Sequence, residues 1–220
     1  MRLSYSRLNS SRFSKGSYSV WDRFPHGFFY SIIMKDAISE KGKWKVLKSE
    51  YLFRRPWLTV RKDCVELPDG RVNPEFYVME YPDWVNVIAL TEDGKFVMER
   101  QYRHGLGKTC IEIPAGVMEA GESPLEAAKR ELMEETGYGD GEWSELMTIS
   151  GNSSTTDNLS HCFVARNVKK VSGQHLDSTE DLEIVLLDKE DVRDLLVNDQ
   201  IKQALMAAPL WRFFAENKLL

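Results

Sequence analysis

Residues 116–138 read GVMEAGESPLEAAKRELMEETGY, and this segment restricts the fold more than any other part of the sequence. Ser123 is placed as a helix N-cap, Pro124 suits the first helical position, and Glu126 completes a Ser-x-x-Glu capping box. Gly137 stands where a left-handed residue commonly closes a helix. The segment therefore predicts a helix with both ends marked.

This helix has an apolar face and an acidic face. The apolar stripe would pack on a sheet and consists of Leu125, Ala128 and Leu132. Glu131 and Glu135 lie one turn apart on another face with Glu134 beside them, and the negative C-terminal end of the helix dipole cannot relieve their repulsion. A solvated acidic face would explain this pattern. A missing cation would also explain it, because carboxylates and the backbone carbonyls of a glycine-flanked loop suit a hard divalent ion.

The remaining sequence predicts two groups of strands and a helical tail. Segments 43–53, 57–67 and 75–82 alternate as three antiparallel strands do, with the turn Pro68-Asp69-Gly70 between the last two. A central sheet is predicted from later apolar segments, namely 83–91, 95–103, 109–116, 159–168 and 181–187. After Glu190 we expect two helices with apolar faces.

Composition narrows the class of protein. With 220 residues, 42% of them hydrophobic, the chain can bury a sizeable core. A net charge of -5 argues against a nucleic-acid or membrane-surface binder, and no apolar run is long enough to cross a membrane. The three cysteines are widely spaced, which fits neither a disulfide framework nor a zinc site, so we expect a reducing, cytoplasmic location.

Residues 1–33 differ from the rest because they are rich in serine and basic residues and contain no acid before Asp22. An organelle-targeting segment is one interpretation. The favoured one is a disordered or non-native extension that precedes a start at Met34. The predicted organisation is therefore an extension over 1–33, antiparallel strands over 34–82 and a second, larger domain over 83–220.

The acidic segment resembles the Nudix box, Gly-x5-Glu-x7-Arg-Glu-U-x-Glu-Glu-x-Gly-U, where U is a bulky apolar residue. The matching residues are Gly116, Glu122, Arg130, Glu131, Leu132, Glu134, Glu135, Gly137 and Tyr138. Tyr138 is a mild departure because that position is usually aliphatic. The resemblance implies an α/β/α sandwich with a mixed sheet, preceded by a small antiparallel strand subdomain.

The same resemblance implies roles for the matched residues. Glu131 and Glu135 would be the principal ligands of Mg²⁺, or alternatively Mn²⁺, with Glu134 a further ligand or a base. The backbone carbonyl of Ala115 would add a ligand, and the positioning residues would be Arg130 and Glu122. Magnesium would neutralise a diphosphate and activate a water for attack on phosphorus.

Similarity to the ADP-ribose and nucleotide-sugar pyrophosphatase branch extends over roughly residues 43–200, through ERQYR at 99–103 and IEIPAG at 111–116. It implies that Arg103 contacts the substrate, together with Gln101 and Gly116. It also implies that the N-terminal strands exchange across a homodimer. Aromatic residues there could stack on the base or belong to the core, which is the commoner case; the candidates are Phe53, Trp57 and Trp84.

One departure concerns the general base. The branch carries a Pro-Gly loop followed by Glu, whereas this chain has no proline between Pro124 and Pro209. Asp157, Glu180 or Glu183 could replace that base. His104 and His161 are interpreted as structural side chains, and Cys110 lacks a partner that would make it a nucleophile.

Three functions follow from the resemblance. The first is Mg²⁺-dependent hydrolysis of a small nucleoside diphosphate derivative, ADP-ribose or a related nucleotide sugar, to a nucleoside monophosphate and a sugar phosphate. A Nudix-fold regulator that binds the nucleotide without cleaving it is the second, and the complete set of acids counts against it. A hydrolase of nucleoside triphosphates or dinucleoside polyphosphates is the third, and the extra N-terminal strands over residues 43–82 count against that.

Overall fold

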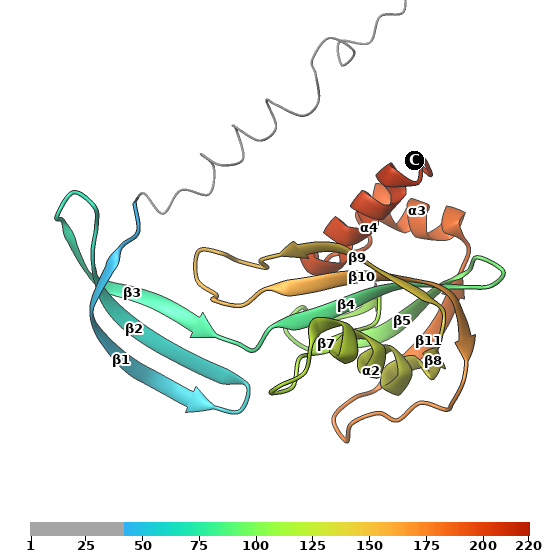
Figure 1. Ribbon diagram of the computed structural model, residues 1–220, viewed down its shortest axis with the longest axis horizontal. Helices are drawn as coiled ribbons and strands as arrows, with labels where there is room; N and C mark the ends of the chain where they lie inside the picture. The colour runs from blue at the N-terminus through green and yellow to red at the C-terminus, as the bar shows by residue number, and fades with distance from the viewer. Residues whose placement is uncertain (1–41) are drawn as a thin grey trace, which may run out of the picture.

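A computed structural model describes residues 42–220, so the predicted extension over residues 1–33 lies outside the described part. Two sheets and three helices are arranged along the described chain (Figure 1). The elements are β1 (Lys45–Arg55), β2 (Leu58–Glu66), β3 (Val72–Glu80), β4 (Trp84–Thr91), β5 (Phe96–Arg103), β6 (Lys108–Glu112), β7 (Ala115–Val117), α2 (Pro124–Thr136), β8 (Tyr138–Gly139), β9 (Glu142–Ile149), β10 (Ser160–Lys170), β11 (Leu182–Leu187), α3 (Lys189–Val197) and α4 (Ala204–Glu216).

The N-terminal strands form a separate antiparallel sheet in the order β1-β2-β3, which confirms the three predicted strands. Figure 1 shows this sheet standing beside the rest of the molecule and joined to it through the segment between β3 and β4. Every residue of β1 is exposed. The sheet is held internally by ion pairs, among them Arg61 with Asp63 at 2.9 Å and Arg61 with Glu80.

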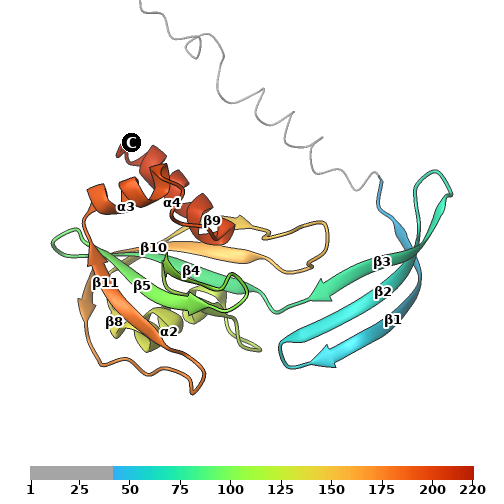
Figure 2. The ribbon, with the colours of Figure 1, turned by 180° about the vertical axis from the view of Figure 1, so that it is seen from behind.

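The larger sheet is mixed, with β4 and β10 parallel and the remaining strand pairs antiparallel. Helix α2 covers one face, and α3 and α4 cover the other (Figures 1 and 2). The predicted α/β/α sandwich is thereby confirmed. Strand β9 was not predicted, because its sequence EWSELMTI alternates poorly between apolar and polar residues.

The two central strands of the larger sheet are paired over a short distance. Strands β4 and β5 are paired only at Ala89 with Val97 and at Leu90 with Phe96. Beyond that point β4 pairs with β7 and β5 with β6, so the two central strands diverge. Strand β7 is followed along the chain by α2.

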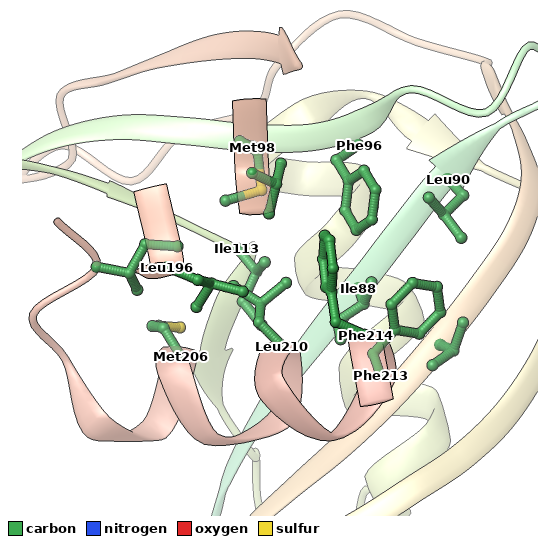
Figure 3. Close-up of a cluster of buried hydrophobic side chains, with 13 residues drawn as sticks. Ile88, Leu90, Phe96, Met98, Ile113, Leu196, Met206, Leu210, Phe213 and Phe214 are labelled. Atoms are coloured by element: carbon green, nitrogen blue, oxygen red, sulfur yellow. The ribbon is translucent and has the colours of Figure 1, made fainter. Parts of the chain in front are cut away.

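Apolar side chains fill both faces of the sheet. Figure 3 shows Phe96, Met98 and Ile88 of the sheet packed against Leu210 and Phe214 of α4. The opposite cluster joins α2 to the sheet and includes Ala127, Ala128, Leu132, Val85, Val87 and Val97. Within residues 42–220, none of the helices combines the length and the hydrophobicity that a membrane crossing requires.

A loop after β9 fixes the junction between the two sheets. Met79 N donates to Thr155 O at 2.7 Å, and Tyr81 N donates to Asp157 Oδ1 at 3.2 Å. Leu159 N also donates to Asp83 Oδ1 at 2.8 Å. These bonds tie the segment that links β3 to β4 onto the larger sheet.

Candidate active site

Helix α2 begins and ends as its sequence predicts. Ser123 and Glu126 form the reciprocal capping box, with Ser123 N donating to Glu126 Oε2 at 2.9 Å and Glu126 N donating to Ser123 Oγ at 3.3 Å. Gly137 closes the helix with φ 67°, in the left-handed region. The predicted apolar stripe is right at Ala128 and Leu132, but Leu125 is exposed because the buried face turns towards Ala127 instead.

Arg130 forms hydrogen bonds with several acidic side chains of the site. Its Nε and Nη2 donate to the two carboxylate oxygens of Glu122 at 2.8 and 3.0 Å. Its Nη1 donates to Glu131 at 2.9 Å and to Glu134 at 3.1 Å, while Nη2 also reaches Val117 O at 2.9 Å. The bonds from Arg130 to Glu122, and then the bond from Glu119 N to the same carboxylate, lower the pKa of Glu122 to about 2. One guanidinium therefore orients three carboxylates and the loop before the helix.

Glu131 and Glu135, the two principal acids of the helix, are buried against β7. Ala115 N donates to Glu135 Oε2 at 3.0 Å. A Cβ on Gly116 would lie 2.0 Å from the carboxyl carbon of Glu131, so only glycine leaves that carboxylate its position. Burial raises the pKa of Glu131 and of Glu135, and the neighbouring acid Glu99 raises that of Glu135 further.

Arg103 lies at the end of β5 beside the same acids. It donates to Glu112 Oε2 from Nε at 3.0 Å and from Nη2 at 2.5 Å. A hollow of about 180 Å³ is lined by Arg103, Ala115 and Gly116 together with residues of β4 and the start of α4. Gln101 is half-buried on the same strand and does not line this hollow. The structure thus brings Arg103 and Gly116 together and leaves Gln101 apart.

The three candidates for the general base lie in different parts of the structure. Asp157 holds the backbone of Tyr81 at the junction of the sheets. Glu183 is an exposed partner of Arg100 at 2.6 Å. Glu180 is close enough for its charge to raise the pKa of Glu131 and Glu135. Only Glu180 of the three is near the buried acids.

None of the aromatic candidates is fully buried within residues 42–220. Trp57 is 80% exposed and Phe53 is 54% exposed, so the expectation of core packing is wrong for both. Trp84 is half-buried, lines the hollow beside Arg103 and packs on Tyr81 with ring centroids 5.5 Å apart.

The two histidines and the cysteine that were set aside as catalytic residues have different surroundings. His161 contacts Asp83 Oδ2 at 3.1 Å and Thr148 Oγ1 at 3.3 Å, which confirms a structural side chain. His104 packs near the Tyr102 ring. Cys110 is buried, and within residues 42–220 it forms no disulfide.

Sequence reasoning did not assign Glu99 to the site. Its side chain is 3% exposed on β5 and faces Glu135. The sequence did contain a signal for it. Glu99 comes two residues after Val97 in FVMERQYR, so strand alternation places its carboxylate on the same inward face as that buried apolar side chain.

Comparison with known proteins agrees with this geometry. The NUDIX domain family matches residues 80–207, and the nucleoside diphosphate sugar hydrolase N-terminal domain matches residues 44–79. The chain belongs to the NUDIX family. It is a Nudix pyrophosphohydrolase acting on small nucleoside diphosphate derivatives.

Two relatives align with most of the chain. One is the methanol dehydrogenase activator of Bacillus methanolicus, 34% identical over 71% of this chain and 85% of its own length. The other is the ADP-ribose pyrophosphatase of Bacillus subtilis, 31% identical over 73% of this chain and 86% of its own length. A solved ADP compounds hydrolase has a TM-score of 0.71 over 80% of this chain and 95% of its own, at 24% identity, which supports the fold.

Nudix hydrolases generally use divalent metal ions, and the residues present fit such an ion. Within residues 42–220 no three His, Cys, Asp or Glu side chains are already grouped around one point, and Arg130 forms ion pairs with both Glu131 and Glu134. The buried acids Glu99 and Glu135 nevertheless approach each other, and Glu99 Oε1 is buried without a donor in the described chain. Hard carboxylate oxygens that lack a cation are the donor set that a divalent metal requires.

Proposed function

We propose that this protein is a Mg²⁺-dependent pyrophosphatase of ADP-ribose or a closely related nucleotide sugar. Water adds to one phosphorus of the diphosphate and the bridging P–O bond breaks, which gives a nucleoside monophosphate and a sugar phosphate. The observation that carries the proposal is the complete acidic set of α2, held by Arg130 beside a hollow that Arg103 lines. The name of the Bacillus subtilis relative supports the substrate.

Each side chain has a defined task in this proposal. Glu131, Glu135 and the carbonyl of Ala115 would hold Mg²⁺, or Mn²⁺ in its place. When bound, the metal neutralises the diphosphate and lowers the pKa of a coordinated water. Arg130 keeps the acids oriented, and Glu122 keeps Arg130 in place through two hydrogen bonds.

Binding and proton transfer would use the neighbouring groups. Arg103 places a guanidinium at the hollow, where it can contact a phosphate or a sugar hydroxyl. Gly116 lines the same hollow and would contact the substrate through its backbone, whereas Gln101, which does not line the hollow, would contact the substrate only outside it. Glu180 would accept the proton of the attacking water, with Glu134 as the second candidate, because Glu180 lies near the buried acids.

The isolated N-terminal sheet supports a homodimer. Exposed large hydrophobic side chains collect on it, namely Trp44, Val46, Leu47, Tyr51, Leu52, Phe53, Trp57, Leu58, Val72 and Tyr77. A patch of this kind marks an interaction surface in a protein that does not aggregate. We propose that residues 34–82 serve dimerisation and substrate binding while residues 83–220 carry out hydrolysis. The free cysteines support a cytoplasmic location.

The test is hydrolysis of a substrate panel in the presence of Mg²⁺, with products separated by chromatography. The panel contains ADP-ribose, GDP-mannose, UDP-glucose, a diadenosine polyphosphate and a nucleoside triphosphate. We expect ADP-ribose to be cleaved and Glu135→Gln to reduce kcat about 100- to 1000-fold, the loss typical of removing one group that stabilises the transition state.

Glu142→Gln is the matched control because Glu142 is exposed at the start of β9. It should retain wild-type activity. Preferential cleavage of a nucleoside triphosphate would reject the substrate assignment. Nucleotide binding without cleavage of any compound would replace the hydrolase by a regulator.

A further inference from the structure

Glu99 is a buried acid that the Nudix box does not contain. It lies on β5, where its Cα neighbours in the adjacent strands are Glu112 of β6 and Ile184 of β11. Its side chain is 3% exposed, as deeply buried as the apolar residues around it. An ionised carboxylate at such depth is costly unless a cation or several donors compensate it.

The surroundings of Glu99 supply acids rather than donors. The Glu135 carboxyl is within hydrogen-bonding reach, and the charges of Glu112 and Glu180 act on the same place. The nearby cation, Arg103, spends two of its donors on Glu112. Oxygen Oε1 of Glu99 is buried with no hydrogen-bond partner in the described chain. Glu99 therefore lies beside Glu135 and feels the charges of further acids, while the guanidinium of Arg103 is already bound to Glu112.

We propose that Glu99 is an additional carboxylate of the divalent-metal site and faces Glu135 across the ion from strand β5. The proposal rests on the metal-dependent hydrolysis inferred above. Helix α2 supplies acids from one side, and β5 would supply an acid from the opposite side. A metal held between a helix and a strand is fixed by two rigid elements, which favours a defined position for the reacting water.

A proton shared between Glu99 and Glu135 is the competing explanation. Glu99→Gln separates the two explanations. Glutamine has the same size, and its amide can donate a hydrogen bond to Glu135, so it reproduces the shared-proton arrangement. It cannot reproduce an anionic metal ligand.

The experiment measures Mn²⁺ binding to the full-length protein without substrate, using the paramagnetic resonance signal of free Mn²⁺. We expect Glu99→Gln to bind Mn²⁺ about 10- to 100-fold more weakly than the wild type, the loss typical when a residue that supports a metal site is replaced. Glu142→Gln should bind as the wild type does. An unchanged Kd in folded Glu99→Gln overturns the proposal.

Circular dichroism and the Tm establish that the variant is folded. Should Glu99→Gln fail to fold, Glu99→Asp keeps the charge and withdraws it by one methylene, and the same loss of Mn²⁺ affinity is expected. An unchanged Kd in Glu99→Asp would then overturn the assignment.

Hydrolysis of ADP-ribose distinguishes this inference from the proposed function. If the wild type leaves ADP-ribose intact while Glu99→Gln binds Mn²⁺ weakly, the substrate assignment fails and the role of Glu99 stands. If the wild type cleaves ADP-ribose and Glu99→Gln binds Mn²⁺ normally, the function stands and the role of Glu99 fails.

Discussion

At the scale of single residues, the site depends on two residues that position the acids and take no direct part in the reaction. Arg130 binds Glu122, Glu131 and Glu134 and thereby limits how far each acid can move. Gly116 provides the space into which the Glu131 carboxylate extends. Positioning of this kind matters because small displacements of reacting groups cost large factors in rate.

Gly116→Ala should inactivate the enzyme without unfolding it. The new methyl would coincide with the Glu131 carboxylate, which is the flexible end of a side chain and must move away, while the backbone at Gly116 is not left-handed. We expect kcat to fall roughly 100-fold, as for other misplaced reacting groups, with little change in Tm. Gly105→Ala is the control because a Cβ there has nothing within 4 Å. Equal activities in the two variants would contradict the argument.

Glu122→Gln should lower stability in a pH-dependent way. The pKa of Glu122 is about 2 in the folded protein, below its ordinary value of 4.5, so its ion pair stabilises the fold above pH 4.5. This contribution is lost as the pH falls from 4.5 towards 2. Because the pair is partly solvated, we expect a difference of about 1 kcal/mol from the wild type at pH 7. Urea unfolding at pH 7 and pH 3 measures it, and the same difference at both values would exclude linkage to Glu122.

At the scale of elements, α4 contains a proline that the rest of the fold accommodates. Pro209 lies inside the helix and has no N–H, so it cannot donate to the carbonyl of Leu205 one turn earlier. The side chain of Asn86 on β4 supplies the missing donor, with Nδ2 at 2.9 Å from Leu205 O. A buried polar side chain of the sheet thereby supplies a hydrogen bond that the helix backbone lacks.

A double-mutant cycle tests this arrangement. We expect Asn86→Ala to cost about 2–3 kcal/mol of unfolding free energy, since it leaves a buried carbonyl unpaired. In the Pro209→Ala background residue 209 regains an N–H, so the cost of Asn86→Ala should be about 1 kcal/mol smaller. Denaturant unfolding of the four proteins gives the coupling. Identical costs in both backgrounds would show that Asn86 does not replace the helical donor.

At the scale of the whole molecule, the three-stranded sheet is the part that residues 42–220 leave largely uncovered. Figures 1 and 2 show it separated from the sandwich on both views. The loop through Thr155 and Asp157 fixes only its junction end. Within residues 42–220, no other element covers the apolar side chains of β1.

Sedimentation velocity should detect a dimer at micromolar concentration. Phe53→Lys should shift the protein to monomer, because a charge placed in an apolar contact between subunits loses its hydration. Val197→Lys, at an exposed position of α3, is the matched control and should stay dimeric. A wild type that sediments as a monomer would remove the exchanged-strand arrangement and with it the proposed role of residues 34–82.

The sequence by itself determined the helix of the site, its two caps and the acids on its face, because these depend on interactions within about four residues. It also determined where most strands lie along the chain, since apolar alternation is a local signal. Strand β9 was missed because its pairing with β10 stabilises it more than its own pattern does.

Tertiary structure alone decided which distant groups share the site. Glu99 meets Glu135 across 36 positions of sequence, Glu180 approaches the same acids from a later loop, and Asn86 meets Leu205. Burial changes the cost of each such charge or polar group, and burial depends on how the sheet, the loops and the helices pack together. Local pattern therefore located the helix that carries the acids, and only packing showed which strand and loop residues face it.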